Sequence, residues 1–207
     1  MELPGIPPDL LSTVLDAARA SGVKRLALVG GAVRDALLHL QHHDPWRGLP
    51  DLDFVVEGSA EALAQHLLQR CGEERVSELR VHGSYGTVEL ILDGVLLDLA
   101  AARQESYPAP GFNPVVEPGL LELDLARRDF TVNALALELP LNAVAPQRSV
   151  QERLLDLHGG QAHLARRQLA FLHDTSVADD PTRVIRAARY GARLGFSLAP
   201  EAAKQIK

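Results

Sequence analysis

The chain has 207 residues, enough for one hydrophobic core and part of a second. With 46% hydrophobic and 23% charged residues it has an ordinary globular composition, and its short apolar runs argue against a membrane-spanning helix. The net charge of −6 argues against a uniformly basic nucleic-acid-binding chain, so a nucleic acid would have to bind a local patch. The single cysteine, Cys71, excludes an intramolecular disulfide framework and is typical of a cytoplasmic protein.

The first half of the chain predicts strands that alternate with helices. A polar loop at residues 41–50 separates the first strand and helix from the next pair, and the Asp93-Gly94 dipeptide between two apolar runs predicts a hairpin. The expected elements are a helix over Leu10–Ala20, a strand over Lys24–Gly30, a helix over Ala32–Leu40, a strand over Asp51–Gly58, a helix over Ser59–Gln69, and strands over Gly86–Leu92 and Val95–Ala101.

The second half predicts mainly helices after a long loop rich in Pro and Gly at residues 103–119. Strands and helices followed by helices alone indicate an α+β unit and then an all-α unit, which we divide at residues 1–140 and 141–207. The last residues lie inside an expected helix, so we expect the all-α unit to be truncated here. The expected helices cover Asp129–Leu137, Gln161–Arg167, Asp180–Leu194 and the residues from Pro200 onward.

Two carboxylates, Asp51 and Asp53, stand two residues apart in the segment DLDFVV. Alternate side chains of a strand point to the same face, so these two lie together while Leu52 and Phe54 face the other way. Neighbouring carboxylates repel each other unless a cation joins them, and oxygen ligands of this kind suit Mg²⁺. The alternative is a polar strand end without a ligand.

A third carboxylate, Asp98, interrupts the apolar strand VLLDLAA, where a charge is costly unless it is paired or bound to metal. If this strand neighbours DLDFVV, Asp98 completes a two-metal site in which one metal activates a hydroxyl and the other steadies a leaving pyrophosphate. A structural hydrogen-bond acceptor is the equal alternative.

The segment LVGGAVRDALL predicts a phosphate-binding turn between a strand and a helix. Gly30 and Gly31 let the backbone approach a ligand, and a helix N-terminus offers free N–H groups to anions. Arg34 in the first turn adds a charged donor for a triphosphate. Many strand–helix turns use glycine for geometry alone, and the segment is neither a dinucleotide fingerprint nor a Walker motif.

Two later segments carry further polar candidates. In LARRDFTVNALAL, Arg128 is a candidate sugar or phosphate contact or else a surface partner of Asp129, which can cap the helix expected after it. Asn133 on that helix could orient a loop or a ribose.

In ADDPTRVIRAARYGARLGF, the arginines share about a third of a helix circumference, a pattern that is usually a solvated face; they are Arg183, Arg186, Arg189 and Arg193. Asp180 and Arg183, at positions i and i+3, place an acceptor beside fixed donors. Cytosine and adenine match this pair through an amino donor next to a ring-nitrogen acceptor, whereas guanine and uracil do not. The residues thus predict a pocket that accepts CTP and ATP.

Together these blocks resemble the class II tRNA nucleotidyltransferase and poly(A) polymerase family of the DNA polymerase β superfamily. The resemblance runs from Leu28 to Phe196 with the blocks in family order. It implies a polymerase β-like nucleotidyltransferase head, with a small mixed sheet and flanking helices, followed by an all-α neck. It also implies that Asp51 and Asp53 bind Mg²⁺, that Gly31 and Arg34 contact the nucleotide, and that a further set lines its pocket: Arg128, Asp180, Arg183, Arg186 and Arg189.

The family resemblance implies template-independent addition of CMP and AMP, from CTP and ATP, to the 3′ end of tRNA. A CC-adding or A-adding specialist, a poly(A) polymerase, and a nucleotide-binding fragment inactive without its tRNA-binding domains remain alternatives; the oligomeric state remains open. The sequence departs from the family pattern at His39, at Asp179 and in a longer 41–50 loop. We interpret His42, His43 and Asp44 of that loop as loop polarity rather than a metal site.

Overall fold

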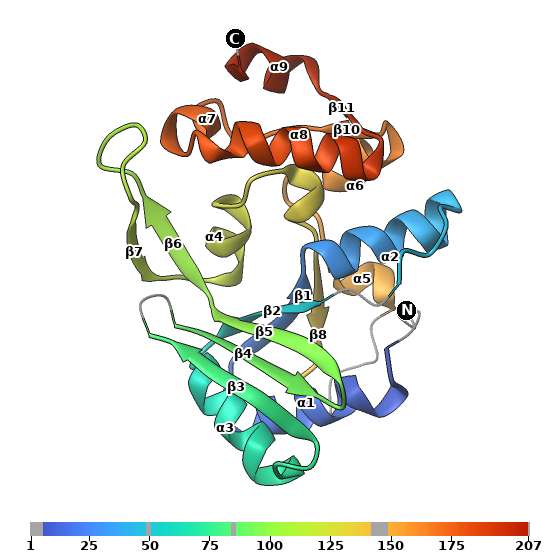
Figure 1. Ribbon diagram of the computed structural model, residues 1–207, viewed down its shortest axis with the longest axis vertical. Coiled ribbons are helices and arrows are strands. Elements are labelled where there is room, and N and C mark those ends of the chain that lie inside the picture. Colours follow the sequence, from blue (N-terminus) through green and yellow to red (C-terminus); the bar gives the residue numbers. More distant parts are fainter. Residues whose placement is uncertain (1–5, 49–50, 84–85, 142–148, 207) are drawn as a thin grey trace.

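A computed structural model describes residues 6–48, 51–83, 86–141 and 149–206. Its centre is a mixed sheet with the strand order β3-β4-β5-β2-β1-β8-β9 (Figure 1). Neighbouring strands of this sheet are antiparallel except β2 and β5, which run parallel. The strands are β1 (Arg25–Val29), β2 (Leu52–Glu57), β3 (Val76–His82), β4 (Thr87–Leu92), β5 (Val95–Ala101), β8 (Ala136–Leu139) and β9 (Leu154–Leu155).

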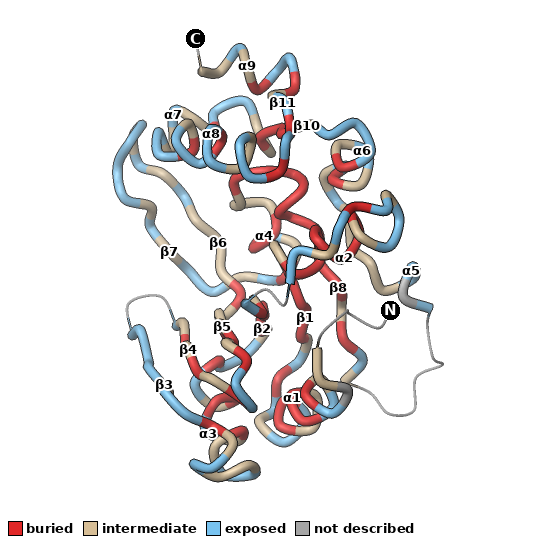
Figure 2. Tube along the Cα trace, turned by 45° about the vertical axis from the view of Figure 1, so that its right-hand side comes forward, coloured by how far each residue is buried: buried red, intermediate tan, exposed pale blue. Residues whose placement is uncertain are grey.

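The two faces of the sheet are covered by different helices. Alternation along β2 sends Leu52 and Phe54 into the main core with α1 (Pro8–Ala20), α2 (Gly31–His42) and α3 (Ala60–Cys71). Val55 on the other face packs in a smaller cluster with the short helix α4 (Leu121–Ala126). The buried strand positions are red in Figure 2. The α+β class predicted from the sequence is confirmed.

The C-terminal part is mainly helical and lies across one end of the sheet (Figure 1). A two-residue parallel pair, β10 with β11, ties its segments together. Because β9 pairs with β8, residues as far as Leu155 extend the sheet, and the division at residue 140 stays a prediction. The elements are α5 (Val150–Arg153), α6 (Gly160–Ala165), β10 (Gln168–Leu169), α7 (Ser176–Asp179), α8 (Thr182–Leu194), β11 (Ser197–Leu198) and α9 (Pro200–Ile206).

The helix predicted over Asp129–Leu137 is wrong. The segment forms a 3-10 turn, η1 (Thr131–Asn133), and then strand β8, which pairs with β1. Its apolar residues are buried on both sides, and a short continuous apolar run does not distinguish a buried strand from a helix.

The loop predicted over residues 103–119 contains a hairpin of β6 (Arg103–Ser106) and β7 (Val115–Pro118), which rises beside α4 (Figure 1). Residues 49–50 of the expected 41–50 loop lie outside the described residues. Within the described part of the chain, no helix combines the length and apolarity needed to cross a bilayer.

Candidate active site

The carboxylates of β2 and β5 form a row across the sheet. Asp53 is in register with Asp98 on the parallel neighbour, and Asp98 is in register with Glu89 of β4. Leu52 and Phe54 are buried in the opposite core, as the strand pattern predicts. The adjacency of the two strands, on which the interpretation of Asp98 depends, is confirmed. Asp51 is exposed just before β2 begins.

This row is electrostatically strained. Burial raises the pKa of Asp53 to about 6, helped by Asp98 and Asp51, although the Arg128 guanidinium opposes the rise. Burial also raises the pKa of Asp98, with Glu89 and Asp51 adding to the effect. A cation at this place would relieve the repulsion. The described residues form no cluster of three or more His, Cys, Asp or Glu that could hold a metal ion.

The backbone of the turn before α2 lies close to the carboxylate row. Gly30 has φ +67°, a conformation that side chains disfavour, and a Cβ atom placed there would lie 3.1 Å from Asp53 Oδ2. The backbone conformation favours glycine, and any side chain would also press against the Asp53 carboxylate. Gly31 begins α2, whose first N–H groups therefore lie next to the carboxylates.

Arg34 lies beneath this turn rather than at its surface, since only 1% of it is exposed. Its Nε and Nη2 donate to Asp35 at 2.8 and 3.0 Å, and its Nη1 donates to Asn133 Oδ1 at 2.6 Å. These bonds use three of the five guanidinium N–H donors, and a nucleotide contact of Arg34 stays a prediction.

Asp129 joins the head to α8 instead of capping a helix, which corrects the predicted cap. Its Oδ1 accepts from Phe130 N at 2.7 Å and from Asn133 Nδ2 at 3.0 Å. Its Oδ2 accepts from Arg186 Nε at 2.8 Å, and Arg186 Nη2 lies 2.6 Å away. A continuous polar chain thus runs from Arg34 through Asn133 and Asp129 to Arg186. The first three are almost completely buried, which makes satisfied pairing necessary.

Tyr190 stands at the centre of this arrangement. Guanidinium carbons of Arg34, Arg186 and Arg189 lie 5.4, 5.7 and 5.8 Å from the centroid of its ring, within cation–π range. Phe130 packs edge-on against it at 5.8 Å. The ring therefore fixes the arginine face of α8 against the head.

Arg128 lies near the carboxylate row and is bonded to α4. Its Nη2 donates to the fully buried Asp124 at 3.0 Å, and its Nε is buried without a partner in the described chain. This partner differs from the Asp129 that the sequence offered as a surface alternative. Arg128 also lies close enough to lower the pKa of Asp53.

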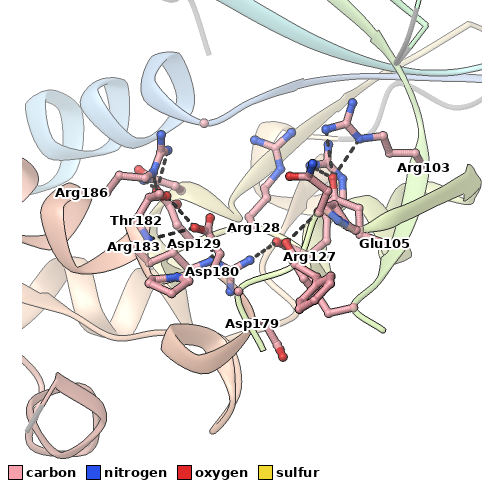
Figure 3. Close-up of a pocket in the computed structure, with 18 of the residues that line it drawn as sticks. Arg103, Glu105, Arg127, Arg128, Asp129, Asp179, Asp180, Thr182, Arg183 and Arg186 are labelled. Atoms are coloured by element: carbon pink, nitrogen blue, oxygen red, sulfur yellow. Dashed lines mark hydrogen bonds and ion pairs between the residues drawn. The ribbon is translucent and has the colours of Figure 1, made fainter. Parts of the chain in front are cut away.

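A pocket of about 590 Å³ opens between the sheet, the β6–β7 hairpin and α8 (Figure 3). Most of the site residues predicted from the sequence line it together: Gly30, Gly31, Asp53, Arg128, Asn133, Asp180, Arg183 and Arg186. Four others are not among its described lining: Arg34, Asp51, Asp98 and Arg189.

Arg183, which lines this pocket, has one donor without a partner among the described residues. The residue is 3% exposed, and its Nη2 donates to the Arg127 carbonyl at 2.8 Å. Its Nη1 is buried without a hydrogen-bond partner in the described chain. Asp180 Oδ2 lies 3.8 Å from Arg183 Nε, so acceptor and donors are neighbours as the i, i+3 spacing predicts.

Sequence reasoning missed a polar cluster on the hairpin side. The Glu105 carboxylate receives Arg103 Nη2 at 2.9 Å, Arg127 Nη1 at 3.1 Å and the Tyr107 hydroxyl at 3.2 Å. Arg103, Glu105 and Tyr107 alternate in the sequence, a period-two pattern that indicates one strand face. The prolines and glycines after them concealed that signal.

Comparison with known proteins identifies the family of the chain. Residues 26–170 match the family described as Poly A polymerase head domain. The chain belongs to this family. Among curated relatives, a CC-adding tRNA nucleotidyltransferase of Deinococcus radiodurans is 44% identical over 189 residues, covering 91% of the chain and 46% of the relative. An A-adding tRNA nucleotidyltransferase of Aquifex aeolicus is 40% identical over 185 residues, covering 88% and 20%.

Solved structures of similar fold cover most of the chain. A structure titled as the apo form II of a CCA-adding enzyme has a TM-score of 0.78 at 30% identity and covers 98% of the chain and 44% of its own. A tRNA nucleotidyltransferase with a primer tRNA and an incoming ATP analog has a TM-score of 0.71 at 36% identity, covering 93% and 48%. The chain thus spans less than half the length of these relatives.

Proposed function

We propose that this chain is the catalytic head and the first part of the neck of a tRNA nucleotidyltransferase, which adds CMP and AMP from CTP and ATP to the 3′ end of tRNA without a nucleic-acid template. The observation that carries the proposal is the composition of one pocket. Asp53 and the Gly30-Gly31 turn form one end of it, and Asp180 with Arg183 forms the other. A nucleotide with its phosphates at the first end and its base at the second matches both.

The metal end fits Mg²⁺ by the chemistry of its donors. Asp51 and Asp53 would hold the ion, because both offer hard carboxylate oxygens and Asp53 is desolvated beside like charges. When bound, Mg²⁺ supplies positive charge that neutralises the triphosphate and activates the attacking hydroxyl. Asp98 is the third ligand of this set or a structural acceptor beside it.

The reaction needs little covalent chemistry from the protein. The 3′ hydroxyl oxygen of the tRNA forms a bond to the α-phosphorus, the bond from that phosphorus to the bridging oxygen breaks, and pyrophosphate leaves with the electron pair. The hydroxyl proton passes to solvent. Arg128 and the first N–H groups of α2 are placed to stabilise phosphate charge, so catalysis here rests on positioning and electrostatics.

The base end supports a choice of cytosine and adenine. Asp180 offers an acceptor for an exocyclic amino group, and the buried Arg183 Nη1 offers a donor for the adjacent ring nitrogen. Guanine and uracil would set a carbonyl against the carboxylate and an N–H against the guanidinium, which leaves buried polar groups unpaired.

A specialist that adds only C or only A is the second candidate. The relatives that share 44% and 40% identity carry specialist names, whereas a multifunctional CCA protein of Haemophilus ducreyi shares 35%. A third possibility is a fragment that binds nucleotides and lacks transfer without tRNA-binding domains.

The test combines binding with incorporation. Titration calorimetry with Mg²⁺ should show that CTP, ATP or both bind the chain at least about tenfold more tightly than GTP and UTP. Incubation with tRNA lacking its 3′ end, followed by product sequencing with CTP alone, ATP alone and both, identifies the subtype. Asp53→Asn should lower incorporation by at least about 100-fold.

Selective binding without incorporation would support the fragment alternative. Equal binding of all four nucleotides, together with incorporation that Asp53→Asn leaves unchanged, would overturn the proposal.

A further inference from the structure

The carboxylate at the base end of the pocket is held by its neighbour Thr182. Asp180 Oδ1 accepts from the Thr182 hydroxyl at 2.6 Å and from the Thr182 backbone N–H at 3.0 Å. Figure 3 shows the two side chains together at the start of α8. The short distance to the hydroxyl is typical of a charge-assisted O–H···O⁻ bond.

These two bonds make the two oxygens of the carboxylate different. Oδ1 is occupied by Thr182, whereas Oδ2 lies 3.8 Å from Arg183 Nε and remains available on the pocket side. The Asp180 side chain is 33% exposed, so packing alone does not immobilise it. The terminal torsion of an aspartate is broad, and without an anchor the two oxygens exchange places easily.

We propose that Thr182 is a positioning residue for base selection: its hydroxyl fixes which oxygen of Asp180 faces the base and at what angle. The proposal rests on the nucleotide pocket inferred above and adds a residue that itself makes no base contact. A donor–acceptor match discriminates between bases only while both groups keep their places, because a mobile carboxylate can turn away from a mismatched carbonyl.

The neighbouring Thr175 provides a matched control. Its hydroxyl donates to Asp179 Oδ2 at 2.8 Å. This is the same type of bond as that of Thr182, but it is made to the aspartate next to Asp180. Thr175 precedes α7 and is not among the described residues that line the pocket. Removing the Thr175 hydroxyl removes a similar bond from this region, while Asp180 keeps both of its bonds to Thr182.

The experiment measures dissociation constants of CTP, ATP, UTP and GTP with Mg²⁺ for wild type, Thr182→Val, Thr182→Ser and Thr175→Val. We expect Thr182→Val to reduce the preference for the favoured base over UTP or GTP by about tenfold, mainly by tighter binding of the mismatched nucleotides. Thr182→Ser should restore the preference, and Thr175→Val should keep it. Binding of inorganic tripolyphosphate with Mg²⁺ should be equal in all four proteins, because the phosphate end is untouched.

The outcomes separate the two proposals. If wild type itself does not distinguish the four bases, the nucleotide pocket inferred above is wrong. If wild type discriminates and Thr182→Val keeps the same ratio of dissociation constants, the role of Thr182 is overturned. A fall in preference that Thr175→Val shares equally, or that Thr182→Ser fails to restore, also overturns it, since a general loosening of the α7–α8 region would then explain the change.

Discussion

At the scale of single residues, the glycine before α2 is the most constrained position of the site. Gly30 combines φ +67° with a space in which a Cβ atom would meet Asp53 Oδ2 at 3.1 Å. Gly94 has a similar φ of +79° and open space around it. Comparing substitutions at the two glycines therefore distinguishes the effect of backbone strain from the effect of contact with the carboxylate row.

We expect Gly30→Ala to lower the free energy of unfolding by about 2 kcal/mol and Gly94→Ala by about 1 kcal/mol, because both add strain and only the first adds a contact. Gly30→Ala should also weaken binding of Mg²⁺-CTP or Mg²⁺-ATP, while Gly94→Ala leaves it intact. Urea unfolding and calorimetric titration measure the two effects. Equal behaviour of the two variants in both assays would contradict the contact argument.

Residue patterns predicted the members of the site better than their contacts. The i, i+2 spacing placed Asp53 on the face opposite Leu52, and the i, i+3 spacing placed Asp180 beside Arg183. The partners of Arg34 and Arg128 were not predictable in this way, because Asn133 and Asp124 reach them through the tertiary fold.

At the scale of elements, the loop after α2 connects the head to the helical part. Asp44 is buried, and its two oxygens accept from Arg167 Nη1 and Nη2 at 3.1 and 2.5 Å. Arg47 Nη1 donates to the Arg193 carbonyl at 3.1 Å near the end of α8. The sequence suggested only a polar loop here. In the structure, Asp44 forms an ion pair with Arg167, which lies far away in the sequence.

We expect Asp44→Asn to lower the free energy of unfolding by about 1 kcal/mol at pH 7, a modest figure because Arg167 is half exposed. The Arg167 guanidinium holds the pKa of Asp44 below its usual 3.8. A lowered pKa stabilises the fold above the unfolded-state value, and the gain is lost as pH falls through the native value. The difference between variant and wild type should therefore shrink below about pH 4.

Urea unfolding from pH 7 to pH 3 measures this difference. Asp16→Asn is the control, because Asp16 pairs with Arg19 and Arg70 at an exposed site and should change stability little. A difference for Asp44→Asn that is absent at pH 7, or that stays constant down to pH 3, would argue against the ion pair.

Two of the strands that escaped prediction, β3 and β8, lack the periodicity of a half-buried element. Strand β3 is an exposed edge strand with a register shift, and Glu78 within it has φ +53°, so regular alternation is missing from its sequence. Strand β8 continues a buried apolar run over residues 134–137, which resembles a helix in composition. Periodicity reports half-buried regular elements, and neither strand is one.

At the scale of the whole molecule, the head and the helical part share a polar chain in addition to one continuous hydrophobic core. Asp129 bonds Asn133 of the head and Arg186 of α8, and Tyr190 stacks beneath the arginines. Because these contacts join the carboxylate end to the base end, the two ends of the pocket are expected to respond together to changes at this junction.

A double-mutant cycle tests this coupling. Asp129→Asn and Arg186→Met should each destabilise the protein, and together by about 1–2 kcal/mol less than the sum, since each removes the same charged bond. The cycle of Asp129 with Arg70, which pairs with Asp16 at an exposed site, is the reference and should be additive within about 0.5 kcal/mol. Additive effects in the first cycle, read from urea unfolding, would show that the two residues act independently.

The parallel pairing of β2 with β5 has a consequence for the order in which the site is completed during synthesis. Asp53 meets Asp98 only after α3 and the strands β3 to β5 have been made, because parallel neighbours need a long crossover. The residues proposed to select the base, Asp180 and Arg183, come much later, around the start of α8. Since a chain leaves the ribosome from its N-terminus, the turn before α2 and the carboxylate row of β2 and β5 emerge while the residues proposed to select the base are still being translated.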